Sequence, residues 1–449
     1  MSTVDRYLAP HVLTQDADER WLSPGVVDVV DGRIDTVGSP QDVPDRPGAR
    51  VHQLSGMLLP GFVNAHAHSP MVLLRGAGEG LPVDRWLTEA IWPREGRLSP
   101  DDIGWGMRLG AAELLAGGVT TSCEMYFRPR VMAEAAREAG LRCLIAPPLL
   151  VSEGPNALGT WEQQLQTAAA FATEHRDDPL IQGVIGPHAA YTVPEAPMRE
   201  AGRIAAAEGL LLHLHVAEAE REGDAIRERY GVSVPRYLER LGVLEARVLA
   251  AHGVWLDRDD IAIFAEHDVA VAHCPNSNGK HASGLAPVTA LRAAGVPVAI
   301  ATDGPASHDR LDVFAEMRAA IRLARLRERD ASVLGPVEAL RMVTVEAAQA
   351  IGRDDLGAIE VGRRADLVLV DTEPLRPVVE RQDLLTHLVW SGSPALVRSV
   401  WVEGRQVVAD GELTTIAARR AAAEVTSRAA RIAWASESPA SRSGSGSDR

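Results

Sequence analysis

Cysteine and lysine are nearly absent from this chain of 449 residues. The three cysteines, Cys123, Cys143 and Cys274, are scattered and show no C-x-x-C spacing, which disfavours a disulfide framework or a cysteine-rich zinc module. Of the 46 basic residues, only Lys280 is a lysine. Any mechanism that requires a lysine side chain must therefore use Lys280.

The chain also lacks long apolar segments and an excess of positive charge. No run reaches the roughly 18 apolar residues that a membrane-spanning helix needs, and the first residues lack the layout of a secretory signal. The net charge is −15, which disfavours a nucleic-acid partner, because such binding depends on Lys and Arg. We therefore expect a cytoplasmic protein that binds neither membranes nor nucleic acid.

Short alternating strands with turn residues mark both ends of the chain. Residues 1–57 contain an Asp-Gly hairpin signal, and residues 356–413 contain a Glu-Gly signal of the same kind. We expect these two segments to form one small β domain. Residues 414–449 begin as an Ala- and Arg-rich helix and end in a Ser- and Gly-rich tail, which is expected to be disordered.

Residues 58–355 alternate apolar runs with amphipathic stretches. Continuous apolar runs are expected of parallel strands buried on both faces, and their alternation with helices indicates parallel βα units. Eight such units predict an α/β fold of the (β/α)₈ barrel type, whose usual size is about 250 residues. The runs are LLPGFVNAHAH, GVTTSCEMYF, LRCLIAPPLL, LIQGVIGPHAA, GLLLHLHVAE, RVLAAHGV, DVAVAHCP and GVPVAIATDG.

Polar residues stand at the ends of most of these runs, where a barrel carries its catalytic groups. His66 and His68 are two apart on one strand, so their imidazoles point to the same face. Imidazole suits Zn, Fe, Ni or Cu, and His215 and Asp303 are the natural third and fourth ligands, with His213 packed beside them. The full set at the run ends is His66, His68, His188, His215, His252, His273 and Asp303.

Five motifs resemble the amidohydrolase superfamily when they are taken together in this order. They are GFVNAHAHSPMVLLRGAGEGLPVDRWLTEAIWPREGRL, HLHVAE, AAHGVWL, HCPNSNGKHASGLAPV and ATDGPASHDRLDVF. Within the superfamily the chain is similar to the cytosine/adenosine deaminase-related branch, which includes methylthioadenosine and S-adenosylhomocysteine deaminases and triazine hydrolases. The resemblance implies a distorted (β/α)₈ barrel with a small β-sandwich. It also implies one catalytic divalent metal, Zn²⁺ in most members, with Fe²⁺ as the alternative.

The resemblance assigns roles to individual residues. Four metal ligands follow from it: His66, His68, His215 and Asp303. The catalytic residues that it implies are Glu218, His252 and Asp303. Asp303 can accept a proton from the attacking water, Glu218 can protonate a ring nitrogen and then the leaving ammonia, and His252 can stabilise developing charge.

Four residues are matched to substrate contacts. They are Trp92 and Glu95 in I-W-P-R-E, His188 and Glu218. Glu95 matches a residue that contacts ribose hydroxyls. The hydrogen-bonding capacity of a carboxylate suits that role, because it can accept from two neighbouring hydroxyls.

The single lysine limits the number of metals. Binuclear relatives bridge two metals with a carboxylated lysine on the fourth strand. Here that strand ends in Gly-Pro-His at His188, and Lys280 follows the seventh strand. We therefore expect one metal, which favours deamination of an aromatic ring over hydrolysis of a cyclic amide.

The sequence predicts a metal-dependent aminohydrolase that removes the exocyclic amino group of a purine-like ring, most simply that of an adenosine derivative. Another heterocycle, such as an oxopurine, pterin or triazine, is the alternative, because Pro147-Pro148 and His308-Asp309 change the expected pocket lining. A non-catalytic scaffold is a remote third reading, which the complete set of site residues disfavours. The expected partner is a small heterocyclic substrate, and a homo-oligomer is compatible with the sequence.

Overall fold

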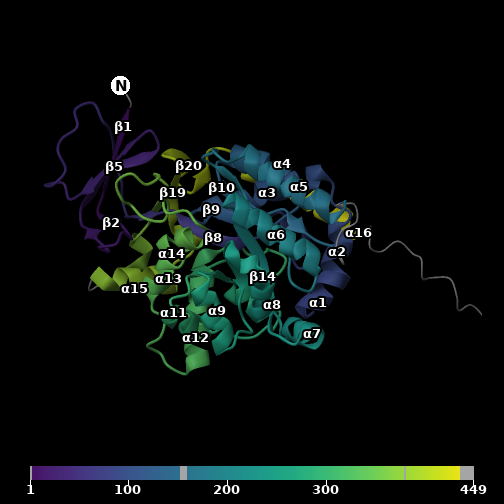
Figure 1. Ribbon diagram of the computed structural model, residues 1–449. Coiled ribbons are helices and arrows are strands. Elements are labelled where there is room, and N and C mark those ends of the chain that lie inside the picture. Colours follow the sequence, from purple (N-terminus) through teal and green to yellow (C-terminus); the bar gives the residue numbers. More distant parts are fainter. Residues whose placement is uncertain (1–2, 152–158, 379–380, 435–449) are drawn as a thin grey trace, which may run out of the picture.

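The computed structural model describes residues 3–151, 159–378 and 381–434. All eight predicted runs contain strands, and these form two four-stranded parallel sheets ordered β12-β10-β9-β8 and β14-β15-β16-β17 (Figure 1). The first sheet comprises β8 (Phe62–Ala67), β9 (Val119–Glu124), β10 (Arg142–Ile145) and β12 (Ile181–Gly183). The second comprises β14 (Leu211–Val216), β15 (Arg247–His252), β16 (Ala270–His273) and β17 (Val298–Ile300). A short parallel pair, β11 (Pro148–Leu149) and β13 (Gly186–Pro187), extends the third and fourth runs.

Isolated parallel bridges link the two sheets. Ile185 pairs with Leu212 and Ala189 pairs with His215 on one side, and Ala67 pairs with Asp303 on the other. The strand order and the parallel direction are those of a TIM-barrel α/β fold. The two junctions rest on these single bridges, whereas the strands within each sheet share continuous ladders.

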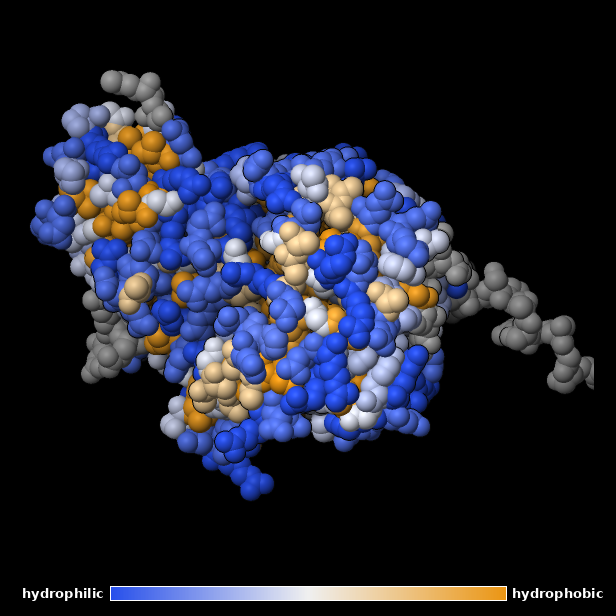
Figure 2. Space-filling model, viewed as in Figure 1, coloured by the Kyte–Doolittle hydropathy of each residue, from blue (hydrophilic) through white to orange (hydrophobic). Residues whose placement is uncertain are grey.

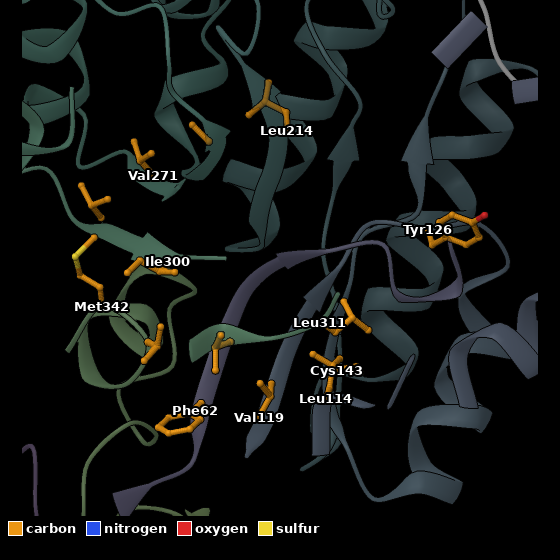
Figure 3. Packing of buried hydrophobic residues seen from close by; sticks show 14 of the residues in the cluster. Phe62, Leu114, Val119, Tyr126, Cys143, Leu214, Val271, Ile300, Leu311 and Met342 are labelled. Atoms are coloured by element: carbon orange, nitrogen blue, oxygen red, sulfur yellow. The ribbon is translucent and has the colours of Figure 1, made fainter. Parts of the chain in front are cut away.

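Helices between the strands cover the outside of the two sheets. Sequence signals set their ends: α3 begins at a capping box of Ser99 and Asp102, with Pro100 in its first turn. The buried cluster beneath the helices includes Leu114 of α3 and Cys143 of β10 (Figure 3). These helices are α3 (Pro100–Ala116), α4 (Pro129–Ala139), α5 (Trp161–Glu174), α6 (Glu195–Glu208), α7 (Glu220–Tyr230), α8 (Val234–Arg240), η3 (Val243–Glu245), α9 (Arg258–Glu266), α10 (Pro275–Lys280), α11 (Val288–Ala293), α12 (Val313–Glu328), α13 (Pro336–Arg341) and α14 (Val345–Ala350).

The segment after the first barrel strand is built from short helical turns. It comprises η1 (Ser69–Leu74), α1 (Val83–Arg85), the π-helix η2 (Trp86–Ile91) and α2 (Trp92–Glu95). Pro93 in the first turn of α2 removes one backbone donor at the point where η2 ends. This segment carries the predicted substrate residues Trp92 and Glu95 to the same end of the barrel as His68.

Both chain ends contribute to two further sheets, ordered β5-β4-β1-β6 and β21-β20-β19-β18-β7-β2-β3. Both predicted hairpins form, and β7 pairs with β18, which joins the two ends of the chain. In Figure 1 the purple N-terminal strands lie on the same side of the molecule as β19 and β20. The strands are β1 (Val4–Ala9), β2 (His11–Leu13), β3 (Trp21–Leu22), β4 (Gly25–Val30), β5 (Arg33–Gly38), β6 (Arg50–Gln53), β7 (Met57–Pro60), β18 (Leu367–Val370), β19 (Val397–Val402), β20 (Arg405–Ala409) and β21 (Glu412–Leu413).

The first apolar run is divided at Gly61 between the two parts of the structure. Its β7 half belongs to the seven-stranded sheet, so the predicted boundary after residue 57 falls inside this strand, and its β8 half enters the barrel. A Cβ atom at Gly61 would lie 2.2 Å from Thr120 Oγ1. Glycine therefore permits the close approach to β9 that begins the barrel. A separate β domain of residues 1–57 and 356–413 stays a prediction.

A buried ion cluster joins the barrel to the seven-stranded sheet. Arg142, at the start of β10, is fully buried and lies 2.9 Å from Asp366 Oδ1 through its Nη2 atom. The same guanidinium contacts Glu403, in the turn between β19 and β20, and the carbonyl oxygen of Pro179. These contacts satisfy a charge that would otherwise be costly to bury.

The remaining helices complete the C-terminal part of the chain. The helix predicted after residue 413 forms as α16, whose Arg431 lies 2.6 Å from Asp102 of α3; the predicted disordered tail, residues 435–449, lies outside the described residues. No helix in the described part is both long and apolar enough to cross a membrane, and the face in Figure 2 is mostly hydrophilic. These elements are η4 (Glu373–Leu375), α15 (Arg381–Ser391), η5 (Pro394–Leu396) and α16 (Ala418–Trp434).

Candidate active site

One pocket opens at the carboxyl ends of the barrel strands and contains nearly all of the predicted site residues. Its lining includes Trp92, Glu95, His68, His188, His215, Glu218, His252 and Asp303. His66 lies directly beneath this lining and is fully buried. His273, at the end of β16, is buried but does not line the pocket.

The four predicted metal ligands lie close together. His66 Nε2 lies 3.4 Å from Asp303 Oδ1, and His68 Nε2 lies 3.2 Å from the same oxygen. His215 Nε2 lies 3.4 Å from His68 Nε2. His66 lies in β8 and His68 directly after it, His215 lies in β14, and Asp303 follows β17, so three separate strands position the cluster.

Backbone carbonyl oxygens orient two of the three imidazoles. His68 Nδ1 donates to the carbonyl of Met125 at 2.6 Å, and His215 Nδ1 donates to the carbonyl of His188 at 2.8 Å. Because Nδ1 carries the proton in each ring, the Nε2 atoms present lone pairs to the cluster.

The third imidazole is oriented by His213. His213 Nδ1 donates to the carbonyl of Leu249 at 2.8 Å, which leaves its Nε2 to accept from His66 Nδ1 at 2.7 Å. His66 Nε2 is then an acceptor, and this buried atom has no hydrogen-bond partner. As expected, His213 packs beside the cluster; it fixes the direction of a ligand, as residues behind metal ligands commonly do.

This arrangement fits a cation. His66 Nε2 and His68 Nε2 both lie within 3.4 Å of Asp303 Oδ1, and His215 Nε2 lies 3.4 Å from His68 Nε2, so electron-rich atoms gather where a positive charge would be stabilised. Burial holds the pKa of His66 and that of His215 well below the usual range, which keeps both rings in the neutral form that binds metals. The triads His66–His68–Asp303 and His66–His215–His252 each bring their ligand atoms within 4.8 Å of one another.

Asp303 is held by short hydrogen bonds and a strained backbone. Its Oδ2 accepts from Ser277 Oγ at 2.6 Å and from Ser307 Oγ at 2.9 Å, and its Oδ1 accepts from the Gly304 amide at 2.7 Å. Its φ of 58° lies in the left-handed region, as does the φ of 74° at His252. Such conformations cluster at functional sites, where the surrounding structure enforces them.

Glu218 and His252 lie side by side at the edge of the cluster. His252 Nε2 is 3.6 Å from Glu218 Oε2, and His252 Nδ1 is 2.9 Å from Asn278 Oδ1. The amide of Glu218 donates to Glu222 Oε2 at 3.0 Å, which fixes the turn after β14. Both side chains are buried yet border the pocket, as proton transfer to a bound ligand requires.

The predicted substrate residues lie around this centre. Glu95 is 7% exposed, and burial raises its pKa to about 7. Trp92 lines the pocket from the other end of α2. His188 Nδ1 lies 2.9 Å from Thr192 Oγ1, and burial lowers the pKa of His188 to about 3, so its ring is neutral.

One expectation about the pocket lining is wrong. Pro148 lines the pocket, but His308 and Asp309 are not among the described residues that border it. His308 Nε2 instead lies 2.7 Å from Glu316 Oε1 of α12, and Asp309 Oδ2 lies 2.5 Å from Lys280 Nζ. The chain turns sharply at Asp309, where φ is 71°, and this directs both side chains toward neighbouring helices.

The sequence analysis did not identify several residues that hold the site residues in place. Glu124 ends β9, is fully buried, and accepts from the amide of Ser69 at 2.8 Å and from Ser122 Oγ at 2.6 Å. It therefore anchors the residue that follows His68. The strand-end rule that selected the histidines also applies to Glu124, whereas no local signal marks Asn278 or Glu222 as partners of the site.

Comparisons with known proteins agree with this geometry. The model of the amidohydrolase family matches residues 57–407. The chain is 38% identical over 427 residues to a 5-methylthioadenosine/S-adenosylhomocysteine deaminase from Pelotomaculum thermopropionicum, covering 94% of this chain and 97% of that protein.

Solved structures show the same likeness in three dimensions. A zinc-bound adenosine deaminase from Xanthomonas campestris superposes with a TM-score of 0.91 at 34% identity, over 96% of this chain and 98% of the other. A zinc complex of an atrazine chlorohydrolase from Arthrobacter aurescens has a TM-score of 0.86 at 26% identity, over 94% and 100% of the two chains. This chain belongs to the amidohydrolase family.

Proposed function

We propose that this protein is a metal-dependent deaminase that replaces the exocyclic amino group of an adenosine derivative with oxygen and releases ammonia. The observation that carries the proposal is one pocket that combines a convergent imidazole–carboxylate cluster with a proton-transfer pair, Glu218 and His252, 3.6 Å apart. The deaminases among its relatives support this reaction class.

The cluster is proposed to hold one divalent ion, zinc first and iron as the alternative, through His66, His68, His215 and Asp303. When bound, such an ion supplies Lewis acidity, which makes hydroxide accessible from water at neutral pH. The zinc complexes of two structural neighbours support the choice of metal. Lys280 pairs with Asp309 and Glu79 away from the cluster, so it does not offer a bridge to a second ion.

The protein's own groups are proposed to move the protons. Asp303 takes a proton from the attacking water, and Glu218 gives a proton to the ring nitrogen next to the amino-bearing carbon. His252 orients the water and stabilises the charge that develops during attack. Glu218 next takes the remaining proton of the added water and supplies it to the leaving amino group, and the proton held by Asp303 returns to Glu218, so that one water is consumed and one ammonia is released.

Every residue in this scheme lies within residues 58–355. We therefore assign catalysis to the distorted (β/α)₈ barrel segment and a structural role to the β-rich chain ends. The residues proposed to contact substrate are Trp92, Glu95, His188 and Glu218.

The test of the proposed function is an ammonia-release assay with adenosine derivatives, pterins and triazines. Adenosine derivatives are expected to react fastest. A faster triazine or pterin would favour the second candidate, which the atrazine chlorohydrolase neighbour and the pocket position of Pro148 support. Release of no ammonia by a protein that also lacks metal would favour a non-catalytic scaffold.

Glu95→Ala is expected to separate nucleosides from free bases. A buried carboxylate that accepts hydrogen bonds from ribose stabilises the bound substrate only when ribose is present. The kcat/KM for an adenosine derivative should therefore fall by an amount equivalent to about 2–4 kcal/mol. Activity on a free base should change far less. Steady-state kinetics on adenosine and adenine measure both values.

Glu89→Ala is the matched control for this substitution. Glu89 precedes Glu95 in the same segment but is exposed and pairs with Arg85. Its loss should leave both activities unchanged. Equal losses on nucleoside and free base in the Glu95 variant would show that Glu95 supports the segment rather than the ribose.

A further inference from the structure

Part of the pocket lining is apolar, and this apolar wall comprises the side chains of Met71, Val83, Trp86, Leu87, Phe127 and Leu150. Polar side chains also line the pocket, namely those of Tyr126, Tyr191, His281 and Ser307. The acidic side chains that line the pocket are Glu95, Glu218 and Asp303. Within the described part of the chain, neither an arginine nor the lysine lines it.

The arginine of the adjoining cavity already has a partner. The cavity that adjoins the pocket at Val83 and Glu218 includes Arg221, whose guanidinium pairs with Asp84. The described pocket lining therefore offers neither a guanidinium nor an ammonium group to a substrate carboxylate.

We propose that this pocket selects adenosine derivatives with a neutral, apolar 5′ substituent and discriminates against the zwitterionic amino-acid substituent of S-adenosylhomocysteine. The proposal rests on the proposed function and names its substrate class. A carboxylate placed against an apolar wall loses its hydration without gaining a cationic partner. Because no guanidinium or ammonium group of the described lining can pair with that carboxylate, the zwitterionic substituent is disfavoured.

A neutral thioether substituent has the opposite properties. A methylthio group loses little on leaving water and gains from burial against apolar surface. Aromatic and methionine side chains such as Trp86 and Met71 suit sulfur, because they are polarisable and pack closely against it. The apolar wall therefore favours the methylthio substituent and disfavours the homocysteine substituent.

The experiment measures kcat/KM of the metal-loaded protein on three nucleosides. They are 5′-methylthioadenosine, 5′-butylthioadenosine and S-adenosylhomocysteine; the butylthio group approaches the length of the homocysteine substituent but is neutral. The two neutral substrates should have similar values, with S-adenosylhomocysteine lower by at least about 10-fold because its charges lack partners.

Three other outcomes of this experiment would each contradict the proposal. Equal values for S-adenosylhomocysteine and the butylthio compound would overturn the proposal, because charge would then not matter. Equally low values for both long substrates would overturn it in favour of selection by size. No turnover of any of the three would overturn the proposed function, and this proposal with it.

Val83→Arg provides a second measurement. Val83 is half-buried on α1 and borders both cavities, so a guanidinium has room to reach the pocket. The ratio of S-adenosylhomocysteine to butylthio turnover should rise by about 10-fold with a cationic partner. Val83→Met, similar in length but neutral, should leave the ratio unchanged. An unchanged ratio in Val83→Arg would count against the proposal.

Discussion

Replacement of Glu218 by glutamine is expected to lower kcat by at least about 10²-fold, the usual scale for loss of an acid–base group. Glutamine keeps the size of the side chain but cannot give a proton to the ring nitrogen. The bound metal should remain, because the four proposed ligands are untouched. Steady-state ammonia release and elemental analysis of the same sample measure the two results.

Glu220→Gln is the matched control for the Glu218 variant. Glu220 is two residues further along the chain, at the exposed start of α7, and should tolerate the change. Wild-type turnover in the Glu218 variant would remove this residue from the mechanism. Loss of metal from the variant would instead place Glu218 among the groups that hold the ion.

Removal of the metal is expected to abolish turnover, with a loss of at least about 10³-fold, since Lewis acidity contributes several kcal/mol to the chemical step. Elemental analysis of the purified protein should give one divalent ion per chain. Dialysis against a chelator should remove both ion and activity, and added Zn²⁺ should restore both. His66→Ala should cause the same loss of metal and activity, because His66 is a proposed ligand whose Nε2 lies 3.4 Å from Asp303 Oδ1.

His267→Ala serves as the histidine control, because His267 lies outside the pocket beside Glu239. It should keep one ion and full activity. Two tightly held ions per chain would contradict the single-metal site. A protein without metal after expression in metal-supplemented medium would contradict the site altogether.

The sequence predicted those features that depend on local pattern. The strand runs, both hairpins and α16 follow from periodicity and turn residues, which act over a few positions. The strand-end rule also brought His66, His68, His215 and Asp303 to one place, because parallel strands in a barrel end at the same edge.

The errors and omissions depend on contacts between distant parts of the chain. His308 was expected in the pocket, but its side chain pairs with Glu316 of α12 instead. Likewise, the role of His213 depends on a carbonyl of the neighbouring strand. The periodicity of a segment indicates which face a residue occupies, but it does not identify the hydrogen-bond or ion-pair partner on that face.

The buried Arg142 charge limits how far this protein can be shortened. Its carboxylate partners, Asp366 and Glu403, are encoded beyond the barrel segment. A fragment of residues 58–355 alone would lack both of these carboxylates, and losing one partner of a buried pair already costs about 3–5 kcal/mol. That cost is a large fraction of the roughly 5–15 kcal/mol by which a native protein is stable. We therefore expect the segment that carries the proposed site to need the C-terminal part of the chain for its stability.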